Sequence, residues 1–308
     1  MTDAEQQRRV RAALIAVQLL FGVNYLVSKQ VVAVMAPAAW AALRVASSLV
    51  VLAILTALFR QRLPRGRDVW YLGGCAVLGV TFNQIFFLEG LSRTTPAHAA
   101  LICSQIPLFA LATAVALGRE RLDVSRVAAL VCGMVGVLVL LEVDHLHLDP
   151  RDLAGDLLIL VSSASYGAYV ALSGRVMARH DPLGATTVVF LCGSAGVMVY
   201  GLDDLLAAPL QALTAGDLAR MAYVVLGATV VTYALNLYAL KHTQASRVAL
   251  YIFLQPVVAT VLSVLVLHEA VTWRLLVAGV LVLASLTLRE LSARSQGARR
   301  RAAVGEKS

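Results

Sequence analysis

Long apolar stretches fill most of the chain, and short polar segments separate them. A helix that spans a membrane needs about 20 mostly apolar residues, and ten stretches of this sequence meet that criterion. The pattern therefore predicts an all-α integral membrane protein with ten transmembrane helices. We expect them at Ala12–Val34, Ala38–Leu58, Val69–Leu91, Ala97–Leu117, Val124–Leu141, Leu153–Gly174, Leu183–Leu202, Leu218–Leu240, Ser246–Leu267 and Leu275–Leu291.

One part of this pattern occurs twice. Pro107 and Pro256 each lie inside an apolar run, and each is followed thirteen residues later by a glutamate, Glu120 in the first copy and Glu269 in the second. The two prolines are 149 residues apart, and so are the two glutamates. Self-similarity at a fixed offset indicates an internal duplication.

Nearer the N-terminus of each copy the offset is 145 residues, because Gly22 matches Gly167 and Pro37 matches Pro182. A longer loop in the second half explains the change. Each half holds five predicted helices, and an odd number makes the two halves cross the membrane in opposite directions. The sequence thus predicts two inverted five-helix repeats, the architecture of many secondary transporters.

Composition supports the membrane assignment. The chain is 59% hydrophobic and 14% charged, with a mean hydropathy of +0.79, whereas soluble domains are about 45–50% apolar and about 25% charged. The four cysteines lie in apolar runs without the spacing of metal ligands. We expect them to pack in the interior rather than to bind a metal.

Positive charge is distributed unevenly between the predicted loops. With a cytoplasmic N-terminus, twenty of the 26 Lys and Arg residues fall on the cytoplasmic side and five on the outer side. Cytoplasmic loops carry an excess of Lys and Arg, so we expect both termini in the cytoplasm. The net charge of +8 then reflects topology and attraction to anionic lipid, and nucleic acid is not an expected partner.

Several motifs resemble those of a known family. They are Pro37 and Arg44 on the second helix, Thr94-Thr95 and Ala97 before the fourth, Pro107, and the ending Glu120-Arg121-Leu122. The chain resembles the drug/metabolite transporter superfamily, in its bacterial ten-helix branch with two EamA domains. The resemblance divides the chain into a first repeat over 12–146, an inverted second repeat over 153–291 and a basic cytoplasmic tail over 292–308.

This resemblance implies a function. It implies a secondary transporter of the bacterial inner membrane that moves a small molecule, most often by exporting amino acids, without a cofactor. We expect alternating access and a monomer in the lipid bilayer. Efflux of drugs or quaternary cations stays open as an alternative. The two halves have diverged, because Val189 stands where Arg44 would map.

Polar groups inside a membrane are costly and often functional, and two matched stripes of such groups stand out. Ser165, Tyr166 and Tyr169 share one face of the sixth helix, and Phe21 and Asn24 hold equivalent positions on the first helix at the 145-residue offset. The stripes are interpreted as walls of a substrate cavity. Hydrogen bonding between helices is the alternative.

Other candidates for the substrate site lie on the third, fourth, eighth and ninth helices. The amides on the third helix either line the cavity or form a buried network, and the histidine at the outer end of the fourth helix is the nearest candidate for a titrating group. These candidates are Asn83, Gln84, His98, Tyr233, Asn236 and Tyr251.

Four further residues are assigned structural or gating roles. Arg44 lies within the second helix, and pairing with Glu89 would offset the cost of burying its charge; a clamp for a substrate carboxylate is the alternative. Pro107 and Pro256 lie near the middle of equivalent helices. Because proline kinks a helix, they are candidates for hinges.

A membrane-embedded enzyme is the competing class of function. The sequence contains no intramembrane His-Glu metal motif, no aspartate pair and no nucleophile elbow, which such enzymes use. It also has no Walker motif for ATP. The sequence therefore favours a secondary transporter over an enzyme.

Overall fold

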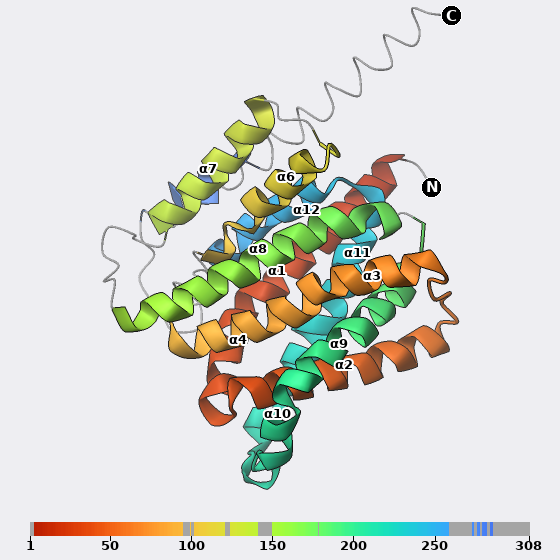
Figure 1. The fold of residues 1–308 in the computed structure, drawn as a ribbon. Coiled ribbons are helices and arrows are strands. Elements are labelled where there is room, and N and C mark those ends of the chain that lie inside the picture. Colours follow the sequence, from red (N-terminus) through yellow and green to blue (C-terminus); the bar gives the residue numbers. More distant parts are fainter. Residues whose placement is uncertain are drawn as a thin grey trace, which may run out of the picture.

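The structure is a computed structural model, and it describes residues 3–94, 99, 102–120, 124–140, 150–177, 179–258, 273, 276–277, 279–281 and 284–285. These residues form a bundle of helices, and none of them lies in a strand (Figure 1). The helices are α1 (Asp3–Val34), α2 (Pro37–Leu58), α3 (Arg67–Ala76), η1 (Val77–Phe82), α4 (Asn83–Arg93), α6 (Ile106–Ala116), α7 (Val124–Leu140), α8 (Pro150–Met177), α9 (Pro182–Ala207), η3 (Leu210–Ala212), α10 (Ala215–Val225), η4 (Leu226–Val231), α11 (Thr232–His242), α12 (Ala245–Leu250) and η5 (Tyr251–Phe253).

Six helices among the described residues are long and apolar enough to cross a membrane. They cover Glu5–Val34, Pro37–Leu58, Arg67–Arg93, Leu153–Met177, Pro182–Ala207 and Ala215–His242. Three shorter apolar helices are Ile106–Ala116, Val127–Gly136 and Arg247–Val258. The predicted all-helical membrane fold is confirmed. The predicted tenth helix lies mostly outside the described residues, as does the whole basic tail.

The duplication is visible in the helix boundaries. The segment α3–η1–α4 is one long helix with a π-helical insert over Val77–Phe82, and the segment α10–η4–α11 has the same insert over Leu226–Val231. The two inserts, and the helices α4 and α11 that follow them, begin and end 149 residues apart. π-helical turns are rare and often lie at functional sites, so their repetition marks this part of both halves.

The two halves pack by exchanging their first helices. Helix α1 lies against α10, η4 and α11 of the second half, and α8 lies against α3, η1 and α4 of the first half. The second helices of the halves, α2 and α9, pair with each other in one of the largest contacts of the bundle. This reciprocal pattern is what a two-fold relation between the halves produces.

Matched glycines allow two equivalent close contacts. A Cβ on Gly22 would meet the Val258 side chain at 2.7 Å and the carbonyl oxygen of Gln255 at 3.2 Å. A Cβ on Gly167 would meet Phe109 at 2.7 Å and the carbonyl oxygen of Ile106 at 3.0 Å. Small residues let helices approach closely in membranes, and here they hold α1 and α8 against equivalent segments.

Both prolines follow an interruption of their helix. Pro107 lies in the first turn of α6, after turn residues at 104 and 105. Pro256 comes three residues after the 3₁₀ segment η5. Because proline lacks the backbone N–H that a continuous helix needs, each helix is broken close to the point that the sequence indicated. Their role as hinges stays a prediction.

Helix α7 forms the edge of the bundle farthest from α2 (Figure 1). A small separate cluster of buried side chains attaches it, made of Leu111, Ala129, Leu130, Leu250 and Phe253. The large core lies between the other helices, and the candidate site lies within that larger core.

Candidate functional site

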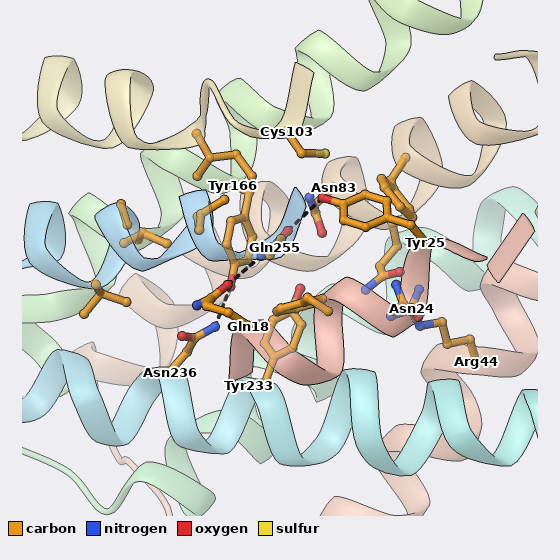
Figure 2. Close-up of a pocket in the computed structure, with 18 residues that line it drawn as sticks. Gln18, Asn24, Tyr25, Arg44, Asn83, Cys103, Tyr166, Tyr233, Asn236 and Gln255 are labelled. Atoms are coloured by element: carbon orange, nitrogen blue, oxygen red, sulfur yellow. Dashed lines mark hydrogen bonds between the residues drawn. The ribbon is translucent and has the colours of Figure 1, made fainter. Parts of the chain in front are cut away.

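A cavity lies at the centre of the bundle, between α1, α2, α8, α12, the two π-containing helices and the segments 103–106 and 252–255. The space there that protein atoms do not occupy amounts to about 710 Å³, a value that includes open solvent. Its walls are Gln18, Phe21, Asn24, Tyr25, Arg44, Asn83, Gln84, Phe87, Cys103, Ile106, Tyr166, Val170, Tyr233, Asn236, Val248, Ala249, Ile252 and Gln255 (Figure 2).

The cavity wall shows the duplication. Several lining residues form pairs at the offsets found in the sequence, so equivalent positions of the two halves face the same space. These pairs are Phe21 with Tyr166, Tyr25 with Val170, Gln84 with Tyr233, Phe87 with Asn236, Cys103 with Ile252, and Ile106 with Gln255. The cavity therefore lies where the two halves meet, as in transporters built from inverted repeats.

A chain of three polar side chains crosses one wall. Tyr25 Oη donates a hydrogen bond to Gln255 Oε1 at 2.8 Å, and Gln255 Nε2 donates to Gln18 Oε1 at 2.7 Å. All three residues are buried. This chain joins α1 to the residue that precedes Pro256 (Figure 2).

A second polar group lies at the end of the cavity formed by α8 and α11. Asn236 Nδ2 donates a hydrogen bond to Tyr166 Oη at 3.0 Å, whereas Asn236 Oδ1 is buried and makes no hydrogen bond to any described residue. Burying an amide oxygen without a partner is costly. Because Asn236 lines the cavity, this oxygen is a candidate acceptor for a bound molecule.

Aromatic rings pack against one another at this end of the cavity. The ring centroids of Tyr166 and Tyr233 are 6.2 Å apart, and Phe190 packs edge-on against Tyr233 at 4.9 Å. Tyr233 also donates a hydrogen bond from Oη to the carbonyl oxygen of Gly79 at 2.6 Å. This bond ties α11 to the π-helical insert of the other half.

Tyr169 is not among the residues that line the cavity. Its side chain is 1% exposed and packs between Tyr166, Tyr233 and the backbone at Gly79. Its hydroxyl is buried and has no hydrogen-bond partner among the described residues. The prediction that Tyr169 faces the cavity is wrong, because the helix turns this residue toward η1; Tyr166 and Asn24 do line the cavity.

The third helix contributes both of the amides that the sequence indicated. Asn83 and Gln84 line the cavity. Asn83 Nδ2 donates to Ser162 Oγ at 3.0 Å, and Ser162 Oγ donates back to the Asn83 carbonyl oxygen at 3.0 Å. Asn83 therefore combines the two roles that the sequence left open, a lining position and a hydrogen bond between helices.

Arg44 is buried at the end of the cavity opposite Asn236, with 2% of its surface exposed (Figure 2). Its Nε donates a hydrogen bond to Thr229 Oγ1 at 2.8 Å. Thr229 donates its own proton to the carbonyl oxygen of Val224 at 2.7 Å, across the π-helical insert. The threonine is thereby oriented to accept from the arginine.

The expected pair between Arg44 and Glu89 does not form. Glu89 accepts hydrogen bonds from Arg93 and from Tyr200, each at 2.7 Å. Arg93 lies four residues after Glu89, so both share the outward face of α4. Arg44 faces inward, and no described carboxylate makes an ion pair with it.

The remaining predicted site residues lie elsewhere. Ser165 and Tyr251 are buried but do not line the cavity. Pro107 and Pro256 adjoin it through their neighbours Ile106 and Gln255. His98 lies outside the described residues. In the part of the chain that the structure describes, no group of three His, Cys, Asp or Glu side chains could hold a metal ion.

Ten lining residues were absent from the sequence-based candidates: Gln18, Tyr25, Phe87, Cys103, Ile106, Val170, Val248, Ala249, Ile252 and Gln255. Two of them could have been found from the sequence. Gln18 and Gln255 are amides within apolar runs, and buried polar groups in membranes are worth attention.

Comparisons with known proteins agree with this architecture. A sequence profile of the EamA-like transporter family matches residues 11–142 and again residues 153–289. The chain belongs to the EamA-like transporter family. It is a membrane transporter of the EamA type rather than an enzyme, as the sequence predicted.

Relatives of this EamA protein occur in plants, archaea and bacteria. A WAT1-related chloroplastic protein of Arabidopsis thaliana is 24% identical over 283 residues, which cover 89% of this chain and 68% of the relative. An uncharacterized transporter of Archaeoglobus fulgidus is 24% identical, with 85% of this chain and 92% of the relative covered. The uncharacterized transporter YyaM of Bacillus subtilis is also 24% identical, over 81% and 83%.

A protein of known crystal structure has the same fold. It superposes with a TM-score of 0.76 over 94% of this chain and 99% of its own, at 19% sequence identity. At this identity the likeness concerns the fold alone.

Proposed function

We propose that this EamA-type transporter moves small polar metabolites, with amino acids as the leading class, by alternating access to the central cavity. The observation that carries the proposal is the cavity itself. It lies between the two halves, and amides and tyrosines from both halves line it. Small-molecule sites combine such apolar and aromatic walls with a few placed polar groups.

The polar groups of the cavity suit a molecule with hydrogen-bonding groups at two ends. Arg44 supplies donors at one end, and Asn236 supplies an acceptor that no described residue uses. Tyr166 and Phe21 present aromatic surface between them. Efflux of quaternary cations is less well supported, because among the described lining residues no side chain is acidic and the charged one, Arg44, is positive.

Alternating access is proposed from the packing of the halves. The first helix of each half lies against the π-containing helix of the other half, so a change in the angle between the halves would open one side of the cavity as the other closes. Such rigid-body rocking around a fixed site is the usual mechanism for repeats of this kind. The export direction and the inner-membrane location are parts of the same proposal.

Counterflow in proteoliposomes tests this function. Vesicles that contain the purified protein are preloaded with unlabelled amino acids, and the uptake of radiolabelled leucine is followed. We expect transient accumulation above that of protein-free vesicles, and loss of most of it in Tyr166→Ala. A matched variant, Tyr238→Ala, changes a tyrosine that does not line the cavity and should keep the signal. If no amino acid that is tried accumulates above the level in protein-free vesicles, the proposal is ruled out.

A further inference from the structure

Among the described residues that line the cavity, Arg44 has the one charged side chain, and no described carboxylate compensates it. Its side chain is almost completely buried, and its Nε is held by Thr229 Oγ1 at 2.8 Å. The two terminal NH₂ groups of the guanidinium make no hydrogen bond to a described residue. Figure 2 shows the side chain extending toward the interior of the cavity.

An arginine in this situation is expensive to keep. A buried charge without a partner costs several kcal/mol by general estimate, and charged groups within membrane spans normally face a cavity or a partner. Yet Glu89, the carboxylate that the sequence suggested as its partner, accepts hydrogen bonds from Arg93 and Tyr200 instead. The positive charge is therefore left to be neutralised by something that enters the cavity.

The contact with Thr229 orients the guanidinium. Because Nε bonds to Thr229 in η4, the edge of the guanidinium that carries the two terminal NH₂ groups faces away from η4. Two parallel N–H groups match the two oxygens of a carboxylate, and this bidentate geometry is a reason for arginine rather than lysine at such sites.

A second donor lies at the same end. Asn24 accepts a hydrogen bond from Ser28 Oγ on Oδ1 at 2.9 Å, which leaves its Nδ2 group without a partner among the described residues. Asn24 and Arg44 appear at the same end of the cavity in Figure 2, and both line it. The groups without a described partner, the NH₂ groups of Arg44 and Nδ2 of Asn24, are donors, which suits an anion and disfavours a cation.

We infer that Arg44, positioned by Thr229 and assisted by Asn24, binds the carboxylate of the transported molecule, so that the cavity selects organic carboxylates over cations. This inference rests on the proposed function for its physiological meaning. Its binding step can be tested without transport. The charge is present in one half only, since Val189 holds the equivalent position on α9, so the carboxylate end of the molecule has one orientation.

Three probes with the same carbon skeleton test the inference: leucine, 4-methylpentanoate and leucinamide. Leucine is a zwitterion, 4-methylpentanoate keeps the carboxylate alone, and leucinamide keeps the cationic amine alone. Thermal unfolding of the purified full-length protein is measured at increasing concentrations of each probe, since a ligand of the folded state raises the transition temperature. We expect leucine and 4-methylpentanoate to raise it and leucinamide to leave it unchanged.

Two variants locate the effect. Arg44→Gln should weaken binding of the carboxylate probes roughly 10- to 100-fold, the range for a lost charge-assisted hydrogen bond. Asn24→Asp keeps Arg44 but places a carboxylate beside it, so this variant should fold at least as well as the wild type and lose the response to both carboxylate probes. Arg93→Gln removes an arginine outside the cavity and should respond like the wild type.

The outcomes separate the inference from the proposed function. Stabilisation by leucinamide equal to that by 4-methylpentanoate, an unchanged response in Arg44→Gln and Asn24→Asp, or no response to either carboxylate would overturn the inference. Carboxylate-dependent stabilisation without counterflow of any amino acid would support the inference and contradict the proposed function. Counterflow that persists in Asn24→Asp would support transport and contradict the role of Arg44.

Discussion

The hydroxyl of Tyr25 lies 2.8 Å from Oε1 of Gln255, although 230 residues of chain separate them. Tyr25 belongs to the first helix of the first half, and Gln255 precedes the proline of the second half. Gln18 accepts from the other end of the same amide at 2.7 Å. One glutamine side chain therefore links two turns of α1 to the other repeat.

Removing this link should destabilise the protein. Tyr25→Phe leaves the buried Gln255 oxygen without its donor, and such an unsatisfied group costs about 1–3 kcal/mol. We expect a lower transition temperature for Tyr25→Phe in thermal unfolding of the detergent-solubilised protein. Tyr238→Phe is the control, because the Tyr238 side chain makes a ring contact with His242 and no hydrogen bond from its hydroxyl is among the described contacts. Equal transition temperatures for the two variants would show that the link does not stabilise the fold.

A methyl group at Gly79 should disturb the packing of η1 against α8. A Cβ there would lie 2.4 Å from the ring of Tyr169, and both are held between helices. Overpacking of a core costs about 1–3 kcal/mol, so Gly79→Ala should lower the thermal stability. Gly74 lies on the same helix, and a Cβ there has no atom within 4 Å.

Gly74→Ala is thus the matched control and should unfold at the wild-type temperature or slightly above it, because alanine is the better helix former. If both alanine variants unfold at the wild-type temperature, the tight contact at Gly79 does not exist in the protein.

The two tyrosines of α8 should respond in opposite directions to loss of their hydroxyl. Tyr169 buries its hydroxyl without a partner among the described residues, so Tyr169→Phe should leave the stability unchanged or raise it by up to about 1 kcal/mol. Tyr166 accepts from Asn236 at 3.0 Å, so Tyr166→Phe should lower the stability by about 1 kcal/mol. Chemical or thermal unfolding of both variants measures the difference. A larger loss for Tyr169→Phe than for Tyr166→Phe would contradict these positions.

Topology can be measured independently of the fold. The charge asymmetry predicts a cytoplasmic C-terminus and an outer loop around Leu210–Ala212, between α9 and α10. A reporter that is active only outside the inner membrane should be silent when fused after the last residue and active when inserted in that loop. Activity at the C-terminal fusion, or silence in the loop, would refute the predicted orientation.

The sequence predicted the fold well because an internal duplication repeats sequence features at a fixed offset. The offset of 149 residues between Pro107 and Pro256 also separates the π-helical inserts and the ends of α4 and α11. The lengths of the apolar runs also predicted the six long spans of the structure. They could do so because the thickness of the hydrocarbon layer sets the length of a helix that crosses it.

The candidate site could be predicted only in part. Sequence gives the depth of a residue along a helix, whereas the rotation of the helix decides what that residue faces. Arg44 and Glu89 were paired by depth, but Glu89 shares the outward face of α4 with Arg93, and that i, i+4 spacing was a usable signal. The pairing of Tyr25 with Gln255 depends on how the halves pack, which no local pattern contains.

The exchanged packing of the halves has a consequence for how the chain folds. Because α1 and α8 each lie against the long π-containing helix of the opposite half, a single half made alone would expose the faces that these contacts cover. Among the described residues, those faces are buried by the other half of the chain. The two halves are for that reason expected to fold as one unit, and neither is expected to be stable without the other.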